Sequence, residues 1–110
     1  MASDFSYKLT LSAQKELDEI LFYMTDTLSN PTAAASFLDK FEDAVKTLTV
    51  FPESGALCKN PFSVYTDIRK IPVKNYTAFY KVDHEKRLII IIKVVYSHRN
   101  MEEIHKELHI

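Results

Sequence analysis

The sequence predicts a single α+β domain over residues 1–110, in which an N-terminal strand and a helical hairpin precede a three-strand antiparallel meander. Three observations lead to this fold class: an alternating apolar stretch near the N-terminus, two segments with apolar residues at helical spacing, and three β-rich runs separated by short breaks. Because the helices precede the meander, we expect them to cover one face of an antiparallel sheet.

The first element is expected over residues 5–11, where apolar and polar residues alternate as in a half-buried strand. Ser12 follows as the expected N-cap of the first helix. The apolar stripe of this helix recurs at helical spacing and consists of Ala13, Leu17, Ile20, Leu21, Met24 and Leu28.

The second helix is expected to begin at Asn30, which can cap it, with Pro31 in its first turn. Its apolar stripe consists of Ala34, Phe37, Leu38, Phe41, Val45 and Leu48. Since the break between the helices is short, we expect an antiparallel hairpin whose apolar side packs against the sheet.

The meander is expected over residues 67–74, 76–82 and 87–96, which are rich in β-branched and aromatic residues. The last of these strands is apolar on both faces, which indicates a central position. The predicted core includes Leu17, Ile20, Phe37, Phe41, Ile90 and Ile92. Beyond the meander, Met101, Ile104 and Leu108 at helical spacing predict a short terminal helix.

Charge and composition restrict the functional classes. The chain has 15 acidic and 14 basic residues and a formal charge of -1, a poor fit to a protein that binds nucleic acid by bulk charge. The longest apolar run, residues 88–96, is interrupted by Lys93 and is far shorter than the roughly 20 residues of a membrane helix. With no signal-like N-terminus, we expect a cytoplasmic protein without membrane contact.

Cofactors and metals are not expected. A single cysteine, Cys58, excludes an internal disulfide and fits a reducing compartment, and a single glycine, Gly55, leaves no glycine-rich phosphate loop. The histidines at positions 84, 105 and 109 show no metal-ligand spacing with acidic or cysteine partners.

Four segments in the same order resemble the RelE/ParE superfamily, the toxins of type II toxin–antitoxin pairs. These segments are "YKLTLSAQKELDEILFYM", "AAASFLDKFEDAVKTLTVFPESG", "DIRKIPVKNYTAFYKVD" and "IIIIKVVYSHRN". The resemblance implies a helical hairpin against a curved antiparallel sheet and a cognate antitoxin as partner. RelE-like members cut messenger RNA in the ribosomal A site, whereas ParE-like members poison DNA gyrase and are not nucleases.

Arg69 is the first candidate catalytic residue, because it matches an arginine that RelE-like enzymes place on the first meander strand. Its planar, permanently charged guanidinium is suited to holding a phosphate during attack by a ribose 2'-hydroxyl. The alternative is a structural role, in which Arg69 pairs with a carboxylate such as Asp67 or Asp83.

His98 and Arg99 are the other catalytic candidates, because they follow the last strand where the family often has an arginine or a histidine. Imidazole can act as acid or base at cellular pH, and Arg99 can supply charge. The alternative is an exposed histidine and a solvated arginine at the end of a strand. Lys70, Lys74 and Tyr96 are candidates for contacts with RNA, although lysines often only solubilise a sheet edge and tyrosines often line a core.

Two features depart from the RelE pattern: the last residues contain no tyrosine, and the chain lacks a strong positive charge. Both favour a ParE-like activity, while Arg69 with His98 favours the nuclease. The sequence therefore predicts first a RelE-like, metal-independent endoribonuclease that acts on ribosome-bound messenger RNA. A DNA gyrase poison is the alternative, and a silent protein that only binds an antitoxin remains open. Lys93, inside the isoleucine run, either reaches outward from a sheet edge or serves the site.

Overall fold

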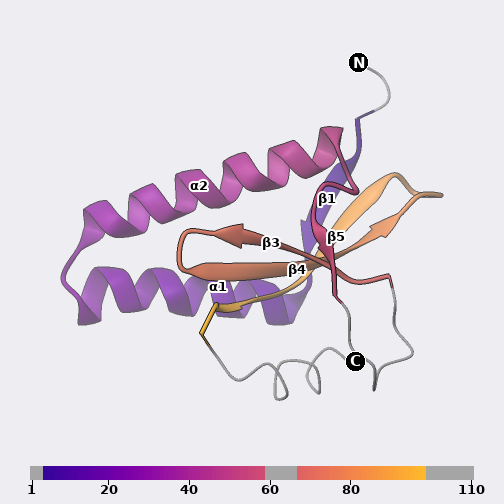
Figure 1. Cartoon of the computed structure of the whole chain (residues 1–110). Coiled ribbons are helices and arrows are strands. Elements are labelled where there is room, and N and C mark those ends of the chain that lie inside the picture. Colours follow the sequence, from indigo (N-terminus) through magenta and orange to yellow (C-terminus); the bar gives the residue numbers. More distant parts are fainter. Residues whose placement is uncertain (1–3, 59–66, 99–110) are drawn as a thin grey trace.

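The computed structural model describes residues 4–58 and 67–98 and has the expected architecture, a helical hairpin on one face of a mainly antiparallel sheet (Figure 1). The sheet order is β1-β5-β4-β3-β2. The predicted C-terminal helix and Arg99 lie outside the described residues. In chain order the elements are β1 Ser6–Leu9, α1 Leu11–Phe22, the π-helical turn η1 Tyr23–Thr27, α2 Pro31–Val50, β2 Ala56–Leu57, β3 Arg69–Val73, β4 Tyr76–Asp83 and β5 Leu88–Tyr96.

The N-cap of α1 is Thr10, so the prediction of Ser12 is wrong. The Thr10 hydroxyl accepts a hydrogen bond from the Ala13 amide at 3.1 Å, which satisfies one of the free donors at the start of the helix. The helix therefore begins at Leu11, whose side chain is exposed, and the preceding strand ends at Leu9.

The hairpin turn combines a π-helical end with a left-handed residue. The Leu28 amide donates to the Tyr23 carbonyl at 3.0 Å, which closes the wide turn of η1, and Ser29 has φ 50°. Asn30 then caps α2 by accepting the Ala33 amide at 3.0 Å, as predicted. Most residues of the two predicted apolar stripes face the sheet, but Leu28, predicted in the first stripe, is exposed.

The central position of β5 is confirmed, because it lies between β1 and β4. β1 runs parallel to it from the Ser6–Leu88 pair to the Leu9–Ile91 pair, and β4 runs antiparallel to it. The predicted break between β3 and β4 is a two-residue turn in which Lys74 has φ 54°. β2, with only two residues, was not expected.

The main core lies between the helices and the sheet and contains the predicted Leu17, Ile20, Phe37 and Phe41. The prediction was wrong for β5. Ile89 and Ile91 are fully buried under the helices, whereas the expected Ile90 and Ile92 are only half-buried and lie on the other face. A second, smaller cluster on that other face contains Phe79 and Val95, with Ile92 packed against it.

A bulge in β5 changes which residues face the helices. Phe79 pairs with Lys93 and Tyr80 with Ile91, so Ile92 has no opposite residue on β4. Before the bulge, Ile89 and Ile91 face the helices. After the bulge, the next residue that faces them is Val94, which belongs to the main core. Lys93 is thereby placed opposite Phe79, at the edge of the sheet that β1 leaves uncovered after Leu9.

Candidate functional site

The structure places the two main catalytic candidates far apart along the sheet. Arg69 is level with Tyr80 on β4 and Ile91 on β5. His98 lies two residues after the end of β5 and seven residues after Ile91. Because the bulge at Ile92 adds one residue without adding length, about six residues span the distance between these two levels. At the usual rise per strand residue, the separation along the sheet is about 20 Å. At this backbone separation, and with Nη1 of Arg69 bonded to the loop carbonyls of Glu53 and Gly55, the two side chains are not gathered around one site.

Arg69 is engaged in a structural contact at the loop end of the sheet. Its Nη1 donates to the carbonyl of Glu53 at 3.1 Å and to that of Gly55 at 2.8 Å. Neither of the carboxylates considered above, Asp67 or Asp83, is its partner. The arginine therefore fixes the loop between α2 and β2.

Tyr80 supports the same loop from inside the core. Its fully buried hydroxyl donates to the Pro52 carbonyl at 2.8 Å and accepts the Gly55 amide at 3.0 Å. Burial raises the pKa of this phenol, while the Gly55 hydrogen bond and Arg69 lower it. A Cβ atom at Gly55 would lie 2.5 Å from the Tyr80 hydroxyl and 2.8 Å from the Lys70 carbonyl, so the position requires glycine.

The opposite end of the sheet carries a row of aromatic rings that leads from the core to the surface. The ring of Phe37 lies 5.1 Å from that of Tyr76, Tyr76 lies 5.8 Å from Tyr96, and Tyr96 lies 5.2 Å from His98. Tyr96 and His98 share a face, as strand alternation predicts. Both are exposed, so the predicted rigid position of His98 depends on this ring contact.

The two candidate lysines contribute differently. Lys74, in the β3–β4 turn, donates a hydrogen bond to the Ser36 hydroxyl of α2 at 2.8 Å. It also lies near the end of β5, because the neighbouring Asn75 carbonyl accepts a hydrogen bond from the Ser97 amide. Lys70 is on the face of β3 opposite to the helices, level with Phe79. The structure thus groups Lys74, Tyr96 and His98 at one end and leaves Lys70 and Arg69 elsewhere.

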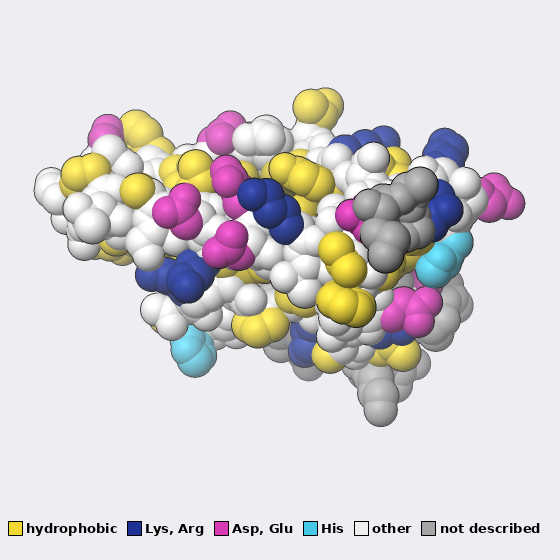
Figure 2. All heavy atoms as spheres, turned by 90° about the horizontal axis from the view of Figure 1, so that it is seen from above, with side chains coloured by type: hydrophobic (Ala, Val, Ile, Leu, Met, Phe, Trp, Pro, Cys, Tyr) yellow, Lys and Arg dark blue, Asp and Glu magenta, His cyan; other side chains and the backbone are white. Residues whose placement is uncertain are grey.

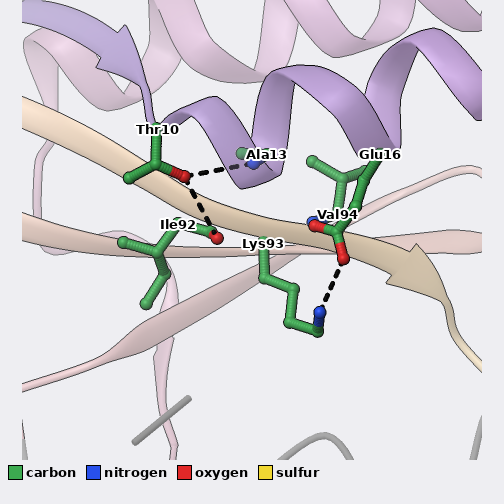
Figure 3. A network of polar contacts seen from close by, with 6 residues as sticks. All are labelled: Thr10, Ala13, Glu16, Ile92, Lys93 and Val94. Atoms are coloured by element: carbon green, nitrogen blue, oxygen red, sulfur yellow. Dashed lines mark hydrogen bonds and ion pairs between the residues drawn. The ribbon is translucent and has the colours of Figure 1, made fainter. Parts of the chain in front are cut away.

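Glu16 on α1 is a residue that the sequence analysis missed (Figure 3). One of its carboxylate oxygens accepts a hydrogen bond from the Lys93 ammonium at 2.6 Å. The other accepts a hydrogen bond from the Val94 amide at 3.0 Å. Thr10 continues the link by donating to the Ile92 carbonyl at 3.4 Å. These contacts satisfy polar groups of β5 beyond the end of β1. A lysine inside an isoleucine run was the signal that a carboxylate partner was required.

Beside this link lies a groove of about 540 Å³ between the C-terminal part of α1 and the end of β5, here called the α1–β5 groove. Its lining includes Glu19, Ile20 and Tyr23 on the helical side and Tyr76, Val94 and Tyr96 on the sheet side. Burial, together with the nearby Tyr23 and Tyr96 phenols, raises the pKa of Tyr76.

The molecular surface over α2 shows no continuous basic region (Figure 2). Acidic and basic side chains alternate there with apolar ones, and the exposed charged residues of α2 are Asp39, Lys40, Glu42, Asp43 and Lys46. This face therefore offers no phosphate-binding surface of the kind that nucleic-acid proteins use.

Residues 4–58 and 67–98 contain neither a metal-binding cluster nor a membrane-spanning helix. Within these ranges, no three histidine, cysteine or acidic residues are grouped so that they could hold a metal ion. The helices in this part of the chain are also too short or too polar to cross a membrane.

The family model of the ParE toxin of type II toxin–antitoxin systems (parDE) matches residues 7–101. The chain therefore belongs to the ParE toxin family, which confirms the RelE/ParE resemblance seen in the sequence. No curated protein sequence matches it significantly.

Solved structures share the fold. The chromosomal ParDE system of P. aeruginosa has TM-score 0.65 and 23% identity, covering 86% of this chain and 97% of that chain. The isolated RelE toxin of E. coli has TM-score 0.59 and 19% identity, covering 94% and 98%. The RelBE2 toxin–antitoxin complex of Mycobacterium tuberculosis has TM-score 0.60 and 17% identity, covering 84% and 98%. These identities support the fold and do not distinguish RelE-like from ParE-like activity.

Proposed function

We propose that this type II toxin inhibits growth by binding and poisoning DNA gyrase, in the manner of ParE-like toxins, and that it does not cut RNA. The observation that carries the proposal is the separation of Arg69 and His98, about 20 Å along the sheet at the usual rise per strand residue. Phosphoryl transfer needs charge stabilisation and proton transfer at one phosphate, within hydrogen-bond reach. The wide separation of these groups argues against that chemistry.

The engagement of Arg69 supports the same conclusion. Its Nη1 already donates to two loop carbonyls, so holding a phosphate through this nitrogen would release the loop between α2 and β2. In the RelE-like alternative, with the ribosome and messenger RNA as partners, a phosphate would have to use the other nitrogens of Arg69, or the loop around Gly55, which Tyr80 also holds, would have to rearrange.

The tip of the helical hairpin suits a protein target. It extends beyond the β3–β4 turn (Figure 1), and Phe22 and Leu28 are 64% and 53% exposed there. Large apolar side chains grouped at a protruding surface are typical of protein–protein contacts rather than of contacts with phosphates.

The target is tested with purified protein. Added to DNA gyrase and relaxed plasmid, it should inhibit supercoiling and cause cleaved DNA to accumulate. Added to ribosomes programmed with a defined message, it should leave the A-site codon intact. Cleavage within that codon, with gyrase unaffected, would overturn the proposal in favour of the RelE-like nuclease.

The second part of the proposal is a cognate antitoxin that neutralises the protein by covering its surface. Expression of the toxin alone should arrest growth, and co-expression with the antitoxin encoded beside it should restore growth. Colony counts after induction, at verified soluble expression, measure both effects. Normal growth under toxin expression alone would refute toxicity and favour the silent, antitoxin-binding alternative.

A further inference from the structure

Among residues 4–58 and 67–98, no strand pairs with the end of β5 on the side of the α1–β5 groove. β1 pairs with β5 only as far as Ile91, and the Val94 amide, which points to this edge, is taken by Glu16. The Ser97 amide points the other way, to the Asn75 carbonyl beside β4. Since successive amides of a strand point to opposite sides, the Tyr96 amide faces the groove edge. An extended chain can hydrogen-bond there.

The opposite edge of the sheet is less suited to such pairing. β2 already pairs with β3 at Arg69 and Lys70. The next stretch of β3 contains Pro72, which has no amide hydrogen to donate. In the part of the chain that the structure describes, one edge of the sheet is therefore blocked by β2 and a proline, and the other is unpaired beyond Ile91, beside the groove.

The chemistry of the groove favours a cation. Glu16 is neutralised by Lys93, but Glu19 forms no ion pair with any residue in the described ranges. The same groove is lined by Tyr23, Tyr76 and Tyr96, and the faces of aromatic rings attract cations. Ile20 and Val94 provide apolar surface for the aliphatic stem of a long basic side chain.

We propose that the α1–β5 groove binds an extended segment of the antitoxin that pairs with the edge of β5 at Tyr96 and places an arginine or lysine side chain between Glu19 and the tyrosine rings. This inference rests on the proposed function only in taking the antitoxin as the partner. Beyond the proposed function, it specifies that the bound segment carries a positive charge and names the toxin residues that recognise this charge. A neutral or acidic segment would leave the Glu19 carboxylate beside apolar side chains without a counter-charge.

The charge recognition is tested by fluorescence anisotropy with a short, labelled peptide of alternating threonine and valine that carries one central arginine. Glu19→Gln should weaken its binding about five- to tenfold, as expected for loss of one partly exposed charged contact supported by aromatic rings. Replacing the arginine by citrulline should weaken binding to the unchanged protein by a similar factor and make it insensitive to Glu19→Gln. Asp18→Asn is the matched control, because Asp18 is exposed on the same helix, bonds to Gln14 and does not line the groove.

The source of the segment is tested with the purified toxin–antitoxin complex. If the antitoxin occupies the groove, the complex should bind the arginine peptide at least tenfold more weakly than the free toxin. Equal binding by the complex would show that the antitoxin lies elsewhere and overturn the inference. Equal effects of Glu19→Gln and Asp18→Asn, or absence of peptide binding, would overturn it as well. Growth arrest is measured with the unchanged toxin alone and peptide binding with the purified protein, so failure here is distinguishable from failure of the proposed function.

Discussion

Arg69 holds the loop between α2 and β2 through two hydrogen bonds from one nitrogen, at 3.1 Å to Glu53 and 2.8 Å to Gly55. Tyr80 binds the same loop from the core side, so the loop is anchored by a charged and a neutral donor. The position of an arginine on a strand does not reveal its role, because a guanidinium can donate hydrogen bonds to a phosphate or to a pair of carbonyls equally well. The role follows from which acceptors the fold brings within reach.

Replacing Arg69 should therefore affect stability. Arg69→Ala should lower the free energy of unfolding by about 2 kcal/mol, because it removes two charge-assisted hydrogen bonds and leaves loop carbonyls without these donors. Urea denaturation measures the change. Lys70→Ala is the control, since Lys70 is the next residue on the same strand but faces away from this loop, and it should cost less than about 1 kcal/mol. A fully stable Arg69→Ala protein that has lost cleavage of ribosome-bound RNA would instead indicate the catalytic role.

α1 and β5 are joined at the level of elements by Glu16, whose carboxylate binds both Lys93 and the Val94 amide. The side chains of Lys93 and Glu16 are only 9% and 19% exposed, so water screens the pair weakly. This link replaces strand pairing along the part of β5 that β1 does not reach, and it fixes the helical wall of the α1–β5 groove.

The link is measured by a double-mutant cycle. Glu16→Ala should cost about 3 kcal/mol, because it leaves a buried ammonium without its carboxylate. With Lys93→Met as the second change, the coupling free energy should be about 2 kcal/mol. Glu19→Ala, on the same helix but outside the ion pair, should change stability by less than about 0.5 kcal/mol. A coupling below about 0.5 kcal/mol would mean that the pair does not hold the two elements together.

Element types could be predicted from the sequence, because apolar periodicity reports which side of a helix or strand is buried. The two helices and the three meander strands lie where their patterns placed them. The face of β5 could not be predicted, since isoleucines fill both faces and the bulge at Ile92 changes the alternation. β2 was not predicted, because Ala56 and Leu57 form a strand through their pairing with β3 and not through a local sequence pattern.

The candidate site could be predicted only in part. Tyr96, His98 and Lys74 do lie at one end of the sheet, because the β3–β4 turn and the end of β5 meet there. Arg69 was predicted to act with His98 because it matches an arginine of RelE-like enzymes, but strand register sets it far from that end. Register depends on the pairing of distant segments, which one sequence does not display.

The whole molecule is a toxin domain with separate structural and interaction ends. The Arg69 end holds the loop after α2, whereas the other end carries exposed aromatic side chains, the open edge of β5 and the α1–β5 groove. Proteins that cut RNA gather their charged and titratable groups at one place. The distribution seen here suits the protein partners that we propose, an antitoxin in the groove and gyrase at the hairpin tip.

Growth arrest by His98→Ala tests this account most directly. His98 is exposed, so the change should leave the fold intact, and circular dichroism with matched soluble expression controls for this. A gyrase-binding toxin needs no proton transfer, so induction of the variant should reduce colony counts to within about threefold of the unchanged toxin. A general acid or base contributes roughly 10²-fold or more to a nuclease rate. A folded His98→Ala protein that no longer arrests growth, while the unchanged toxin does, would contradict the account.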